Sequence, residues 1–320
     1  MPASFPPVPK VSRRQKRTVA ENLPAWAALI VSTCIYLPAQ APQVRQTPTF
    51  RVGVETVVFR VTVTDPLDRH VVGLEKSDFH IYEDKVEQTI DWFSQEASPV
   101  SVGLILDMSS SMGTDRNIQK AKNAIVHFLE KGSEDDEYCL ISFNERTNLV
   151  QRFTRRSATV RSEIATIEVG GRTALFDAVY LGLNEVQKAK NEKKALLLVT
   201  DGEDNSSRYT LSQVRELAKE SDAQIYAIGQ QGREGYGNGV IQSIVSLTGG
   251  RTFFPRTFND LDYYIDLLHG ELRSQYVLAY TPSNKMHDGK WRKIAVKIDP
   301  PAGLPKLIIH AKDGYYAPKN

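Results

Sequence analysis

Between residues 98 and 272, the sequence alternates continuous apolar runs with segments of helical length and periodicity. The runs VSVGLILD, EYCLISF, KALLLVTD and QIYAIGQ are typical of strands buried on both faces of a parallel sheet. After the first run, Ile118, Ala121, Ile125 and Phe128 recur at helical spacing, which predicts an amphipathic helix. We therefore predict an α/β domain with a doubly wound, mostly parallel sheet of the Rossmann-like kind, in which ligands bind at the carboxyl ends of the strands.

Two segments without helical periodicity flank this domain, at residues 50–97 and 273–320. The first opens with the alternating run VVFRVTVT and predicts three or four short strands, and the second predicts three. Sheets this thin need a partner to be stable. We therefore predict that the two segments pair into one β-sandwich, with the α/β domain (98–272) inserted between its halves.

The first 41 residues have the pattern of an export signal. A basic stretch, SRRQKR, precedes the apolar stretch Ala25–Leu37, and the small residues Ala39 and Ala41 follow. The apolar stretch is shorter than the roughly 20 residues that span a bilayer. We predict a signal peptide at 1–41, a linker at 42–49, and an exported protein, periplasmic or at the cell surface, with no membrane span after cleavage.

Charge and cysteine content exclude some classes of function. The formal net charge is +2, and the basic residues form no block beyond the N-terminal stretch, so nucleic acid is not an expected partner. After cleavage only Cys139 remains, which leaves no intramolecular disulfide and predicts a small buried apolar residue.

The glycine-rich stretch GREGYGNG (232–239) lacks the ending of a phosphate loop and is predicted to be a flexible connection.

Three loops that follow predicted strands carry oxygen-bearing side chains. The first is DMSSS, the second GGRT and the third TDGED, and their candidate ligands are Asp107, Ser109, Ser111, Thr173 and Asp201. Hydroxyl and carboxylate oxygens suit Mg²⁺, Mn²⁺ or Ca²⁺ and not Zn²⁺. Two aspartates only neutralise a divalent cation, so the bound ion would still attract an acidic group. The alternative for these residues is that they only form turns and helix caps.

Four further acids lie near the same loops in the sequence, namely Asp115, Asp177, Glu203 and Asp204. We interpret them as solvated loop acids or helix caps in preference to ligands of a second cation.

The combination of D-x-S-x-S, a distant G-G-x-T and a later T-D-G resembles the metal-ion-dependent adhesion site of von Willebrand factor type A domains, over roughly residues 98–270. The resemblance implies that all five candidate ligands bind the metal and that Asp201 acts through water. The compact, hydroxyl-rich donor set favours the smaller ions Mg²⁺ and Mn²⁺ over Ca²⁺. The flanking segments are similar to those of a family of exported bacterial proteins related to this domain.

From these patterns we expect an exported, nonenzymatic module for adhesion or assembly, whose metal is completed by an Asp or Glu of a protein partner. One alternative is a structural protein in which the metal only orders its loops. A weaker alternative is a metal-dependent hydrolase, although the sequence has neither a G-x-S-x-G elbow nor a histidine placed as a base. The sequence leaves the oligomeric state open.

Overall fold

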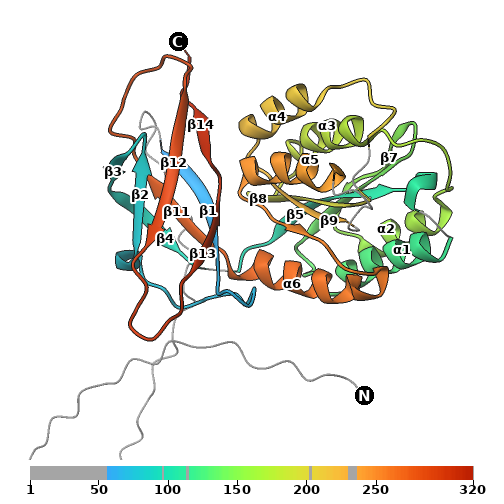
Figure 1. The fold of residues 1–320 in the computed structure, drawn as a ribbon, viewed down its shortest axis with the longest axis horizontal. Helices are drawn as coiled ribbons and strands as arrows, with labels where there is room; N and C mark the ends of the chain where they lie inside the picture. Colours follow the sequence, from blue (N-terminus) through green and yellow to red (C-terminus); the bar gives the residue numbers. More distant parts are fainter. Residues whose placement is uncertain (1–55, 96, 113–114, 202–203, 230–235, 320) are drawn as a thin grey trace, which may run out of the picture.

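The computed structural model shows two parts side by side, a β-sandwich and an α/β domain (Figure 1). It describes residues 56–95, 97–112, 115–201, 204–229 and 236–319. The predicted signal peptide and linker lie outside these residues. No helix within the described part of the chain is long and apolar enough to cross a membrane.

The α/β domain is built on a six-stranded sheet with the strand order β10-β9-β8-β5-β6-β7. All neighbouring strands are parallel except β7, which runs antiparallel to β6 at the edge. The fold class predicted from the apolar runs is therefore confirmed. The strands are β5 (Val100–Asp107), β6 (Glu137–Phe143), β7 (Thr147–Thr154), β8 (Lys193–Thr200), β9 (Gln224–Gly229) and β10 (Thr252–Phe253).

Helices cover both faces of this sheet (Figure 1). Those on one face are α3 (Leu175–Val186), α4 (Leu211–Glu220) and α5 (Tyr236–Val245), and those on the other are α1 (Asp115–Glu130), α2 (Ser157–Thr166) and α6 (Leu261–Ser274). The predicted apolar stripe of α1 is buried against the sheet and α6, as the periodicity indicated. Cys139 is fully buried in β6, as predicted.

The glycine-rich stretch differs from its prediction over residues 236–239, while residues 232–235 lie outside the described residues. Helix α5 begins at Tyr236, so residues 236–239 are helical and do not belong to a loop. Further along this helix, Ile241, Ile244 and Val245 are buried in the core. Their burial outweighs the low helix propensity of the glycines at its start, about 1 kcal/mol for each glycine relative to alanine.

The β-sandwich consists of two four-stranded sheets, ordered β13-β1-β11-β4 and β14-β12-β2-β3. Phe59 of β1 lies opposite Leu278 of β11, so strands from the two ends of the chain pair directly. A single apolar core fills the space between the sheets. The strands are β1 (Val57–Thr64), β2 (Phe79–Glu83), β3 (Val86–Gln88), β4 (Ile90–Ser94), β11 (Tyr276–Tyr280), β12 (Trp291–Ile298), β13 (Ile308–Ala311) and β14 (Gly314–Tyr316).

The chain leaves the sandwich after β4 and re-enters it at β11, and these two strands are antiparallel neighbours. The predicted domain boundary at residue 98 lies between β4 and β5. The boundary predicted at residue 272 lies within α6, which ends at Ser274.

A buried ion-pair network connects the two parts. Nη1 of Arg251 lies 3.1 Å from Oε2 of Glu271 in α6, and Nη2 lies 2.5 Å from Oδ1 of Asp68 in the sandwich. The Glu271 side chain is 0% exposed and that of Arg251 is 8% exposed. Burial raises the pKa of Glu271, and the charge of Arg251 opposes that rise. The charge of Arg251 therefore favours the ionised form of this glutamate.

Candidate metal centre

The first candidate loop begins at Asp107, the last residue of β5, whose side chain is fully buried. Its Oδ1 accepts hydrogen bonds from the backbone N of Ser109 at 2.9 Å and from the Ser109 hydroxyl at 2.5 Å. Its Oδ2 accepts one from the Thr200 hydroxyl at 2.6 Å. Thr200 ends β8, so this bond joins the carboxyl ends of two adjacent strands. Sequence reasoning did not single out Thr200, although it directly precedes Asp201.

The buried carboxylate of Asp107, at the end of β5, favours a cation nearby. Burial raises the pKa of Asp107 to about 6, while hydrogen bonds from Ser109 and Thr200 oppose the rise. The negative charge of Asp201 raises this pKa further. A buried carboxylate that is also repelled by a second carboxylate is stabilised by a nearby positive charge.

The second candidate loop is attached to the first through its backbone. Gly170 N donates to Met108 O at 2.9 Å, and Ser110 N donates to Gly171 O at 3.1 Å. Both glycines have positive φ, 135° and 86°. A Cβ at Gly171 would lie 2.1 Å from a carboxylate oxygen of Glu145. The two positive φ values permit the turn at which the second loop bonds to the first, and the absence of a Cβ at Gly171 leaves room for the Glu145 side chain of the β6–β7 turn.

Thr173 connects the second loop to the third. Its backbone N donates to the side-chain oxygen of Asn205 at 2.9 Å, and its carbonyl accepts from Asn205 N and Ser206 N, both at 3.0 Å. The Thr173 side chain is fully buried. Asn205 is the second residue that sequence reasoning missed; its only signal was its position in the polar run after β8.

The remaining candidate ligands are Asp201 and Ser111. Asp201 follows the last residue of β8, is partly exposed, and lies close enough to Asp107 to affect its pKa. Ser111 belongs to the short 3₁₀ turn Ser110–Met112, but its side chain lies outside the described residues. The loops that carry all five predicted ligands thus lie together at the carboxyl ends of the parallel strands.

The neighbouring acids take part in capping and loop contacts where they are described. Asp204 accepts a hydrogen bond from Phe176 N in the first turn of α3 at 3.2 Å. Asp177 accepts one from Tyr209 N at 2.9 Å, which holds the loop before α4. The contact of Asp204 agrees with its interpretation as a capping acid, whereas Asp177 is buried within α3 and is not the predicted solvated loop acid. The side chains of the other two acids lie outside the described residues, Asp115 and Glu203.

The donor set fits a hard divalent cation. Within the described ranges, no three His, Cys, Asp or Glu side chains form a metal-binding group, so a centre here would combine two carboxylates with hydroxyls. A hydroxyl that donates its hydrogen to a carboxylate, as Ser109 does to Asp107, keeps acceptor lone pairs of the kind that a cation requires. Mg²⁺ and Mn²⁺ prefer such oxygen donors.

A doubly wound sheet whose strand-end loops meet in this way defines an α/β domain of the Rossmann-like class. Residues 101–266 match the von Willebrand factor type A (VWA) domain, and this span is more than half of the chain. The protein belongs to the VWA family.

Two relatives and one solved structure show how far the similarity extends. An uncharacterized protein of Synechocystis is 30% identical over 108 residues, which cover 33% of this chain and 26% of that protein. Human inter-alpha-trypsin inhibitor heavy chain H3 is 24% identical over 142 residues, covering 40% of this chain and 16% of that protein. The chain therefore spans about a quarter or less of these relatives. Proximal thread matrix protein 1 from the mussel byssus shares the fold, with a TM-score of 0.50, 18% identity and coverage of 60% and 51% of the two chains.

Proposed function

We propose that this protein is an exported, divalent-cation-dependent module that binds other proteins in adhesion or assembly. In this proposal Asp107, Ser109, Ser111, Thr173 and Asp201 hold Mg²⁺ or Mn²⁺, and an Asp or Glu of the partner completes the metal's coordination. The observation that supports it best is the attachment of three strand-end loops to one another around the buried, hydrogen-bonded Asp107.

The charge of the donor set explains why a partner's carboxylate would bind. Two aspartates balance the charge of a divalent ion, and the hydroxyls add no further negative charge. The cation would therefore supply a local positive field to an incoming carboxylate, in a site partly shielded from water. VWA proteins are mostly non-enzymatic interaction modules, which favours binding over catalysis.

The first test is calorimetric titration of Mg²⁺ and Mn²⁺ into the metal-stripped full chain. We expect saturable binding that Asp107→Asn abolishes, because the substitution removes one of the two anionic ligands while preserving side-chain size. The matched control is Asp135→Asn. Asp135 is 60% exposed and precedes β6, at the opposite edge of the same sheet, so this variant should bind like the parent protein.

The second test separates partner binding from loop ordering. A peptide with a single Asp should bind in Mg²⁺, lose binding in EDTA, and lose it again when its Asp is replaced by Asn. Metal binding without peptide binding would favour the structural alternative. Metal-dependent turnover of a phosphoester would favour the hydrolase. If the folded protein binds no metal even with the peptide present, the loops are only turns and the proposal fails.

A further inference from the structure

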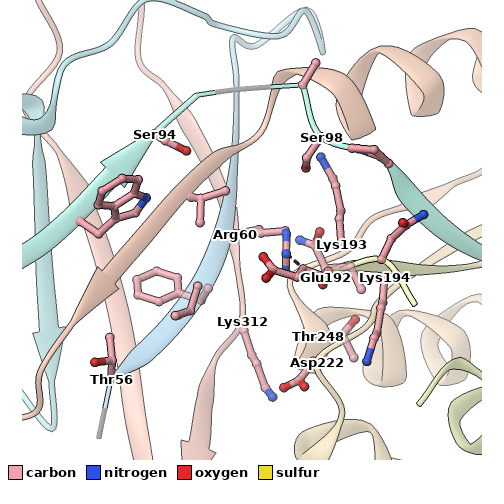
Figure 2. A pocket seen from close by; sticks show the side chains of 18 of the residues that line it. Thr56, Arg60, Ser94, Ser98, Glu192, Lys193, Lys194, Asp222, Thr248 and Lys312 are labelled. Atoms are coloured by element: carbon pink, nitrogen blue, oxygen red, sulfur yellow. Dashed lines mark hydrogen bonds between the residues drawn. The ribbon is translucent and has the colours of Figure 1, made fainter. Parts of the chain in front are cut away.

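A second candidate site lies between the two parts of the protein, away from the metal centre. It is a cleft of about 780 Å³ between the outer face of sheet β13-β1-β11-β4 and the loops preceding β8 and β9 (Figure 2). Lys193, at its wall, begins β8, whereas the candidate metal ligand Asp201 directly follows the end of that strand. At about 3.3 Å per residue, the two sites are roughly 25 Å apart along the strand.

The cleft carries an excess of positive charge. Five cationic residues and two carboxylates, Glu192 and Asp222, line it, which gives a formal excess of three positive charges when all five cationic groups are protonated. Figure 2 shows cationic side chains reaching it from both the sandwich and the α/β domain. The five cationic residues are Arg60, Lys190, Lys193, Lys194 and Lys312.

Three of the cations donate hydrogen bonds to backbone carbonyls, while the carboxylates of Glu192 and Asp222 act on Arg60 without a hydrogen bond to it. Arg60 Nη2 donates to the carbonyl of Glu192 at 3.0 Å, Lys312 Nζ donates to the carbonyl of Ser221 at 2.7 Å, and Lys193 Nζ donates to the carbonyl of Leu272. These acceptors are neutral.

Within the described part of the chain, none of the five cations lies within 4.0 Å of a carboxylate oxygen in an ion pair. Arg60 Nε is buried without a hydrogen-bond partner there, so one strong donor is left unused.

Lys193 is the most buried of these cations. Burial is the main cause that lowers the pKa of its amine to about 7, and the positive charges of Arg60 and Arg273 lower it further. The carboxylates of Glu271 and Asp136 oppose this shift in part. A bound anion would oppose the three lowering effects, because it stabilises the protonated amine and supplies an acceptor to the neighbouring donors.

The sandwich side of the cleft supplies an apolar surface next to these charges. The strand register places Arg60, Val277 and Ser94 in one cross-strand row on the outer face of the sheet. The adjacent row contains Val58, which is 44% exposed, and Trp92. A ligand in the cleft would therefore meet apolar side chains at one end and cations at the other.

We propose that this cleft binds a small organic anion, a carboxylate or phosphate joined to an apolar body. Its volume lies within the range of about 300–1,000 Å³ that is usual for small-molecule sites. The chain's own preceding segment, residues 42–55, is a poor occupant because it contains Arg45 and Arg51 against the single acid Glu55. The net positive charge of this segment would be repelled by the cations of the cleft.

The test is calorimetric titration of phenyl phosphate and phenylacetate into the full chain in EDTA, which removes any contribution from a bound cation. The neutral analogue is 2-phenylethanol. We expect saturable binding of at least one anion, at least tenfold weaker binding of the alcohol, and weakening of anion binding by 0.5 M NaCl. The preferred anion then distinguishes a carboxylate ligand from a phosphate ligand.

Two variants locate the binding. Arg60→Gln and Lys194→Met should each weaken anion binding at least tenfold, and Lys194→Met removes only a partly exposed amine, so it keeps the test valid if Arg60→Gln disturbs folding. Lys297→Met is the control, since Lys297 is exposed on β12 of the other sheet. The proposal is overturned if neither anion binds at 10 mM, if the alcohol binds equally well, or if Lys194→Met binds like the control.

Discussion

Replacing Arg251 with methionine tests whether its buried ion pair with Glu271, at the boundary of the α/β domain with the sandwich, depends on both charges. Methionine keeps most of the apolar stem but removes the guanidinium that lies 3.1 Å from the fully buried Glu271. Breaking a buried pair by removing one partner typically costs about 3–5 kcal/mol, because the other charge stays buried without compensation. The lost contact with Asp68 adds little, since that side chain is 55% exposed. We expect Arg251→Met to lower the free energy of unfolding by about 3–5 kcal/mol.

The pH dependence has a definite sign. The folded pKa of Glu271 is already raised by burial and rises further when Arg251 is removed. Above the ordinary glutamate pKa of about 4.3, the unfolded chain loses a proton that the folded variant retains. The stability deficit of Arg251→Met should therefore be smaller at pH 5 than at pH 8.

Urea denaturation followed by circular dichroism at both pH values is the assay. Adding Glu271→Gln to Arg251→Met should recover much of the loss, because it removes the stranded charge. Arg208→Met is the matched control: Arg208 is 88% exposed and pairs with Asp177, so its loss should cost about 0.2–1 kcal/mol. Equal losses in the two arginine variants, or no recovery in the double variant, would refute the reasoning.

Three other predictions follow from single contacts. Thr200→Val removes a buried hydrogen-bond donor to Asp107 and should lower the unfolding free energy, measured by urea denaturation, by about 1.5–3 kcal/mol. Thr200→Ser keeps the hydroxyl and should retain most of the parent stability; equal losses in the two variants would contradict this. Gly250→Ala should lower the melting temperature or prevent folding, since its Cβ would lie 1.9 Å from the carbonyl oxygen of Ile225; a parent-like thermal melt would show that the backbone can yield. Burial and the charge of Arg251 lower the pKa of His310 to about 4, so the stability it contributes is complete above about pH 6.5 and is lost as the pH falls toward 4. His310→Gln should flatten that part of the profile in melts between pH 7 and 4.5, and an unchanged slope would assign the acid sensitivity to other groups.

The sequence predicted those features that depend on local periodicity or on position at a strand end. The apolar runs identified the central sheet, and Asp107 could be assigned to a strand-end loop because it directly follows one of these runs. The register between Phe59 and Leu278 could not be predicted, because alternation identifies a strand face and not the strand opposite it. The cationic cleft was equally hidden, because Arg60 and Lys312 come from opposite ends of the chain and are assembled only by tertiary packing.

The inserted position of the α/β domain bears on the order of folding. Strands β4 and β11 are antiparallel neighbours although residues 95–275 separate them, and closing so long a loop in an unfolded chain is entropically costly and slow. Once the α/β domain has folded, its own structure brings the ends of those strands together, and it then acts as the turn of a hairpin. We therefore expect the α/β domain to fold before β4 pairs with β11. A substitution that delays folding of the central sheet should delay this pairing as well.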